Sequence, residues 1–104
     1  MYQPGPLVDA CIEFFDREQK ELPPTWRDLI NLDKLDMSDP RKCLLAQLCG
    51  NYAAGLERLR ISRVRAPLLG LTYGAYGAPE SKEAQLEALT AEFKRRIVEH
   101  RAAA

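Results

Sequence analysis

Residues 26–59 read WRDLINLDKLDMSDPRKCLLAQLCGNYAAGLERL, and this stretch decides the fold that the sequence predicts. In its second half, apolar residues recur three and four positions apart, at Leu45, Leu48, Tyr52, Leu56 and Leu59. This spacing is typical of a helix with one apolar stripe. Asp39-Pro40 supplies a start, because aspartate is a good N-cap and proline is tolerated at the first helical position. We therefore predict a long central helix at about 40–59.

A second face of that helix carries small residues, with Ala46, Gly50 and Ala54 spaced four apart. Small residues in this pattern are typical of a surface on which another helix lies close. Glycine inside a helix costs about 1 kcal/mol relative to alanine, which tertiary packing has to offset. We expect the central helix to be buried on two sides. The second side could be covered by the chain's own helices or by a second copy, so a monomer and a homodimer both stay open.

The first half of the stretch follows neither a helical nor a strand period. Thr25 is a good N-cap for a short turn at 26–31, with Asp28 placed to complete a capping box. Apolar residues then alternate irregularly with aspartates, at Ile30, Leu32, Leu35 and Met37 and at Asp33, Asp36 and Asp39. We expect an irregular segment that inserts its apolar side chains under the central helix. A calcium loop needs ligands at every second position and a central glycine, so we predict no metal here.

Two further amphipathic segments flank the central stretch. The first is predicted at 6–22, where Pro23-Pro24 stops it, and the last at 80–100. A short helical turn is predicted at 62–70. Residues 1–104 are thus expected to form one all-α domain, a small bundle of three main helices with one or two short helical turns, because a chain of this length supports a single core.

The overall charge is balanced, with 15 basic and 15 acidic side chains. The distribution is uneven: residues 1–40 hold nine acids and four bases, and residues 41–104 hold six acids and eleven bases. We expect this asymmetry to help the two halves pack together. No apolar run approaches the roughly 20 residues that span a bilayer, and the first ten residues lack the pattern of a signal peptide. The expected location is the cytoplasm.

The residue types that enzymes use are scarce in this chain. His100 is the single histidine, and it falls among charged residues near the end of the last helix. The three cysteines, Cys11, Cys43 and Cys49, have neither disulfide nor zinc spacing and no nearby histidine to activate them. We expect them to pack as small hydrophobic residues. The sequence therefore predicts a protein that is not an enzyme and needs no cofactor.

A binding surface is the alternative to catalysis. We predict a partner-binding surface formed by Arg63, Arg65, Tyr73 and Tyr76, because arginine and tyrosine are enriched at interface hot spots. Two other hypotheses stay open. Nucleic acid could bind one basic face made of Arg58, Arg60, Arg63, Arg65, Lys94, Arg95 and Arg96. A small anion or nucleotide could bind the glycine-rich loop Gly70–Gly77.

One resemblance is carried by the stretch quoted above. An aromatic residue precedes Ile-Asn-Leu-Asp-x-Leu-Asp-Met at 30–37, and Cys-x-Leu-x-Gln-Leu-x-Gly-x-Tyr follows at 43–52, with Gly-Leu at 55–56. This pattern resembles small proteins recurrent in actinobacterial phages, prophages and their hosts. The sequence departs from it at Ala46 and Arg60, where glycine is usual. The resemblance implies a phage or mobile-element context, and it assigns no functional residue. Our separate hypothesis is that the partner is a host or phage protein.

Overall fold

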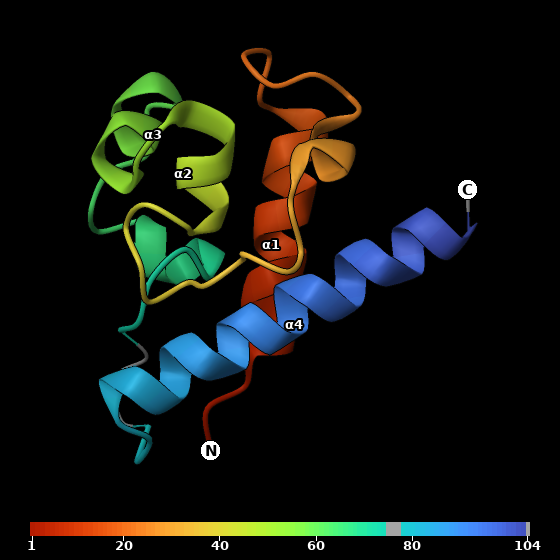
Figure 1. Ribbon diagram of the computed structural model, residues 1–104. Coiled ribbons are helices and arrows are strands. Elements are labelled where there is room, and N and C mark those ends of the chain that lie inside the picture. Colours follow the sequence, from red (N-terminus) through yellow and green to blue (C-terminus); the bar gives the residue numbers. More distant parts are fainter. Residues whose placement is uncertain (75–77, 104) are drawn as a thin grey trace.

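The computed structural model describes residues 1–74 and 78–103 (Figure 1). Within them every regular element is helical, which confirms the predicted all-α fold. The α-helices are α1 (Pro4–Arg17), α2 (Leu44–Cys49), α3 (Tyr52–Arg58) and α4 (Lys82–Ala103), and the 3₁₀ helices are η1 (Trp26–Leu29) and η2 (Ala66–Leu69). In Figure 1, α4 crosses α1, while α2 and α3 lie together beside α1. The short helix η2 also packs against α1.

Helix α1 has the predicted apolar stripe but ends five residues early. Val8, Cys11 and Phe15 are almost completely buried, as the spacing indicates. The helix stops at Arg17, and the following residues turn instead of continuing to residue 22. The Gln19 side chain donates a 2.8 Å hydrogen bond to the carbonyl of Leu59, and Leu22 reaches the core from this turn. The turn therefore serves a tertiary contact that the helical period does not reveal.

The predicted central helix at 40–59 is wrong, because the structure contains two short helices there. Gly50 has a φ of +106°, which the helix cannot accommodate, and Asn51 is extended. The Asn51 side chain accepts a 2.7 Å hydrogen bond from the backbone N–H of Ala54 and so caps α3. At the other end, residues 40–42 form a turn that closes on the Asp39 carbonyl, so α2 begins only at Leu44.

Close approach of helices occurs at a different glycine from the predicted one. A Cβ built on Gly50 meets no described atom within 4 Å, so Gly50 serves the turn and not the packing. A Cβ built on Gly55 would lie 2.6 Å from the Leu45 Cβ. Gly55 therefore allows α3 to lie directly on α2. The expected face of Ala46, Gly50 and Ala54 is not one continuous helical surface, because the chain turns at Gly50, although Ala46 is buried.

We predict that Gly55→Ala lowers the free energy of unfolding by about 1–3 kcal/mol, because the added methyl group forces α2 and α3 apart. Urea unfolding followed by circular dichroism would measure the change. Gly5→Ala is the matched control, since a Cβ on Gly5 meets no described atom within 4 Å in α1. It should be neutral or stabilise by up to about 1 kcal/mol. Equal effects of the two variants would contradict the close contact.

Helix α3 ends in a Schellman motif with an arginine at its left-handed position. The N–H of Ile61 donates to the carbonyl of Leu56, and the N–H of Arg60 donates to the carbonyl of Glu57. Arg60 has a φ of +57°, and it is the one described non-glycine residue with a positive φ. This is one of the two positions at which the sequence departs from the resembling pattern, where glycine is usual. The backbone explains why glycine fits there.

Arg60→Gly should raise the free energy of unfolding by about 1 kcal/mol, since a left-handed conformation costs a non-glycine residue roughly 1–2 kcal/mol. The midpoint of urea unfolding would show the gain. Arg63→Gly is the control, because Arg63 is also exposed but has no positive φ. Arg63→Gly should not raise the free energy of unfolding. If it raised this free energy as much as Arg60→Gly, the stabilisation would come from the loss of a positive charge and not from the backbone conformation.

The irregular segment before α2 has the predicted role. Ile30, Leu35 and Met37 are buried, whereas Asp33 and Asp36 are exposed. Asp36 accepts hydrogen bonds from the backbone and hydroxyl of Ser38, which lower its pKa. The segment is held to α4 by the N–H of Met37, which donates to Thr90 Oγ1 at 2.9 Å. The predicted capping box at Thr25 is wrong, because the Thr25 side chain makes no cap hydrogen bond.

A polar network that the sequence pattern does not predict links α1, η1 and α4. Asp16 of α1 accepts two hydrogen bonds from the Arg27 guanidinium, at 3.0 and 2.7 Å, and one from the Trp26 indole at 2.9 Å. Arg101 of α4 donates to the carbonyls of Arg27 and Ile30, at 2.6 and 2.7 Å. These contacts anchor the last turns of α4, which continues to Ala103.

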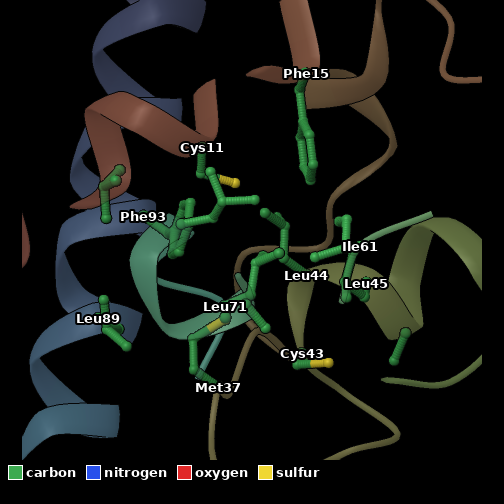
Figure 2. Packing of buried hydrophobic residues seen from close by; sticks show 14 of the residues in the cluster. Cys11, Phe15, Met37, Cys43, Leu44, Leu45, Ile61, Leu71, Leu89 and Phe93 are labelled. Carbon is green, nitrogen blue, oxygen red and sulfur yellow. The ribbon is translucent and has the colours of Figure 1, made fainter. Parts of the chain in front are cut away.

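The core lies where these elements meet (Figure 2). Labelled side chains from α1, α2 and α4 point into one interior, together with residues of the connecting segments: Cys11, Phe15, Met37, Cys43, Leu44, Leu45, Ile61, Leu71, Leu89 and Phe93. The predicted stripe of α4 is confirmed, because Leu86, Leu89, Phe93 and Ile97 are buried. This core leaves part of the η2 region facing outward.

Candidate functional site: an apolar groove beside η2

The η2 segment divides its apolar residues between the core and the surface. A turn precedes it, in which the Arg65 N–H donates to Ser62 Oγ at 3.1 Å, and Pro67 suits its first turn. Ala66 and Leu69 are buried. Val64, just before η2, and Leu68 within it are 82% and 64% exposed. Folding therefore leaves two large aliphatic side chains in water.

Those side chains border a groove of about 600 Å³, here called the η2 groove. Three segments supply its lining, which consists of Tyr52, Arg63, Val64, Pro67, Leu68, Thr72, Tyr73 and Gly74. Tyr73 is a third exposed apolar side chain, at 43%. Exposed apolar residues scattered singly need no explanation, but a contiguous group around a concavity is typical of a binding surface.

The lining residues outside η2 are held by contacts with the rest of the fold. The Tyr52 and Thr72 side chains are hydrogen bonded to each other, and burial raises the pKa of Tyr52. The N–H of Gly74 donates to Gln85 Oε1 at 3.1 Å. The Lys82 ammonium lies 5.0 Å from the centroid of the Tyr73 ring, a cation–π distance that steadies the ring. The described part of the groove is thus positioned before any partner arrives.

Of the three predicted surface residues that the structure describes, two line this groove. Arg63 and Tyr73 both line it. Arg65 points elsewhere: its guanidinium lies 4.3 Å from the centroid of the Phe14 ring and 3.9 Å from a Glu18 carboxylate oxygen. Tyr76 lies outside the described residues. Arg65 therefore covers the core on the α1 side and does not belong to the same surface as Arg63.

The aliphatic half of the groove was missed from the sequence. Val64 and Leu68 stand at helical spacing within a short segment that also contains Ala66 and Leu69. Apolar residues occur all around this short segment, so those on one side of it have to face away from the core. This signal is present in the sequence, although periodicity alone does not say which side is exposed.

Charge around the groove is of one sign. Arg63 is the charged member of the described lining, and that lining contains no carboxylate. A second cation, the Lys82 ammonium, lies beside the lining residue Tyr73. No described carboxylate lies within ion-pair distance of Arg63, whereas Arg65, Arg95 and Arg96 each lie beside one. The groove therefore presents an apolar surface with an unpaired cation at its edge.

The basic residues of the nucleic-acid hypothesis are divided between two places. Arg58, Arg60 and Arg65 border a hollow of about 380 Å³ that also contains Glu18 and Glu21. The α4 cations lie elsewhere, because α4 packs on α1 and not beside the end of α3. Arg95 and Arg96 are ion paired with Glu92, Glu99 and Asp9, and Lys94 lines a hollow that contains Asp36, Glu83 and Glu87. The described cations do not form one continuous basic face.

Three backbone N–H groups in the described part of the Gly70–Gly77 loop already donate hydrogen bonds within the protein. The N–H groups of Gly70, Leu71 and Gly74 donate to Pro67, Ala66 and Gln85. Gly70 is left-handed, with a φ of +65°, and is buried against Leu7 and Leu89. A phosphate cradle needs free N–H groups that point at the anion. These three groups are not available for that role.

The nucleophilic side chains are held in unreactive surroundings. Burial raises the pKa of Cys11, Cys43 and Cys49, which disfavours the thiolate that a nucleophile or a metal ligand requires. His100 is exposed near the end of α4. No cluster of three or more histidine, cysteine, aspartate or glutamate residues that could hold a metal ion occurs in the described part of the chain.

None of the helices described here is both long and apolar enough to cross a membrane. Comparison of the chain with protein-family models, with curated proteins and with solved structures finds no match. The η2 groove is therefore interpreted from its own geometry.

Proposed function

We propose that this chain is a small accessory protein that binds another protein through the η2 groove and does not catalyse a reaction. The single observation that supports this function most strongly is the exposure of Val64, Leu68 and Tyr73 around one concavity of about 600 Å³. Leaving three large apolar side chains in water favours their burial in a complex, at roughly 25 cal/mol for each Å² removed from water.

The proposed biological context is a phage or mobile element, with a host or phage protein as the partner and the bacterial cytoplasm as the place of action. This part of the proposal follows from the resemblance carried by residues 30–37 and 43–56. It is consistent with a chain in which the resembling stretch contributes to the core and the groove is lined mainly by residues after this stretch, together with Tyr52 from within it.

The experiment that tests this function compares Leu68→Glu with a matched variant, Leu29→Glu. Both leucines lie in 3₁₀ helices and are largely exposed, at 64% and 56%, but only Leu68 lines the groove. Each variant would be used to capture partners from the native host, with quantitative mass spectrometry. We expect Leu68→Glu to lose at least about tenfold of the captured partner, because a carboxylate would be buried in an apolar contact.

Both variants should unfold at the same temperature as the unmodified chain, since neither leucine is buried. Leu29→Glu should capture the partner normally. Equal capture by all three proteins would contradict the role of the groove. If both variants lost capture equally, the added negative charge would explain the loss and not the position of the residue in the groove.

A further inference from the structure

We propose that the partner presents to the η2 groove a short amphipathic segment whose apolar side chains contact Val64, Leu68 and Tyr73 and whose aspartate or glutamate side chains pair with Arg63. This inference rests on the proposed function and specifies the chemistry of the partner. It also excludes a second copy of this chain from the groove.

The apolar part of the segment follows from the shape of the site. Val64, Leu68 and Pro67 line the groove together with the rings of Tyr52 and Tyr73. A volume of about 600 Å³ holds several side chains but not a folded domain. Tyr73 is steadied by Lys82, so the ring presents an apolar face without a large loss of side-chain freedom on binding. A short segment with a few apolar anchors fits this space.

The acidic part of the segment follows from the charge. Arg63 is exposed and lies within ion-pair distance of no described carboxylate. Lys82 also lies beside the lining residue Tyr73, so the two charges placed at the groove are both positive and favour a negatively charged partner. Arginine also binds carboxylates through two parallel hydrogen bonds, which fixes the orientation of a bound segment.

A second copy of the chain does not satisfy this charge. In a twofold dimer the same patch meets itself, so Arg63 and Lys82 of both copies would approach one another without a carboxylate in the described lining to separate them. Like charges brought together at an interface are unfavourable. None of the described residues that line the groove is acidic, so the patch offers no carboxylate to a second copy of itself. The partner is therefore a different protein.

Nucleic acid fits the groove less well than an acidic protein segment. It would supply negative charge, but binding along a backbone requires several cations in a row. In the described lining, Arg63 stands with apolar residues, and the other arginines border a hollow that also contains Glu18 and Glu21. One cation beside three aliphatic or aromatic side chains is suited to binding an amphipathic peptide that carries negative charge.

The test is a selection from a displayed library of random 16-residue peptides against the full chain, with counter-selection on Leu68→Glu. Binders that depend on Leu68 should contain two or three large apolar residues and an excess of aspartate and glutamate. A synthetic peptide from this set should bind Arg63→Glu at least about tenfold more weakly than the unmodified chain. Lys34→Glu makes the same change in net charge away from the groove and should bind the peptide normally.

The other outcomes separate this inference from the function on which it rests. Binders that depend on Leu68 but show no acidic excess would overturn the inference and leave the groove as a binding site. A selection without any binder that depends on Leu68 would overturn both. A homodimer in sedimentation that Leu68→Glu dissociates, or an oligonucleotide whose binding Leu68→Glu abolishes, would assign the groove to a different occupant and overturn the inference.

Discussion

Replacement of Trp26 with alanine should lower the free energy of unfolding by about 3–5 kcal/mol, the range for a large buried aromatic side chain. Trp26 is 1% exposed and contacts Phe15 edge to face, with the ring centroids 5.2 Å apart. Its indole N–H donates to Asp16, so alanine would remove both the packing and the hydrogen bond. Urea unfolding followed by far-ultraviolet circular dichroism would measure the loss, because the variant no longer has a tryptophan fluorophore.

Trp26→Phe is the matched variant that separates the two contributions. It keeps most of the contact with Phe15 and removes the indole donor, so it should cost about 1–2 kcal/mol. If Trp26→Phe and Trp26→Ala were equally destabilising, the hydrogen bond and not the packing would dominate. If neither variant changed stability by more than about 1 kcal/mol, the position of η1 against α1 would be contradicted.

Asp16→Asn should lower the free energy of unfolding by about 2 kcal/mol at neutral pH. The Arg27 side chain is 11% exposed, and it would lose its carboxylate partner. Breaking a fully buried pair costs 3–5 kcal/mol, but the Asp16 side chain is 39% exposed, so water screens part of the interaction. The cost should therefore fall below that range. Asp33→Asn, at an exposed aspartate in the segment before α2, is the control and should change little.

The same network gives the stability a dependence on pH. Burial by itself would raise the pKa of Asp16, but hydrogen bonds from Arg27 and Trp26 and the charge of Arg27 outweigh it, so the pKa lies below its ordinary value. The folded chain then holds fewer protons than the unfolded chain in acid. The contribution is complete above about pH 3.9, the ordinary pKa of aspartate, and is lost as the pH falls through the lower folded value. As the pH is lowered from 4, the free energy of unfolding should therefore fall less in Asp16→Asn than in the unmodified chain.

The apolar stripes were predictable because burial repeats at a fixed interval. Leu86, Leu89, Phe93 and Ile97 mark one face of α4 in the sequence, and all four are buried. The break between α2 and α3 was not predictable from the same signal, because the apolar spacing continues unchanged through Gly50. What ends α2 is a positive φ at that glycine, followed by the Asn51 cap. Glycine is compatible with either conformation, so periodicity favoured the wrong one.

Arg63 and Arg65 were predicted to share one surface, but the structure places their side chains apart. Arg63 and Arg65 are two residues apart, and the turn through Ser62 points one toward the groove and the other over Phe14. Composition indicated that arginines and tyrosines in this region could bind a partner, but it did not give the direction of each side chain. Arg101 shows the same limit at long range, since its contact with Arg27 joins residues 74 apart in the chain.

The central claim is that the η2 groove contacts a partner protein, and site-specific photocrosslinking tests it most directly. A photoreactive phenylalanine analogue would replace Leu68 in one version of the full chain and Leu29 in another, with both expressed in the native host and irradiated. If the η2 groove is the contact surface, we expect a covalent adduct with a second protein from position 68 and none from position 29. An adduct of equal yield from both positions, or none from position 68, would contradict it.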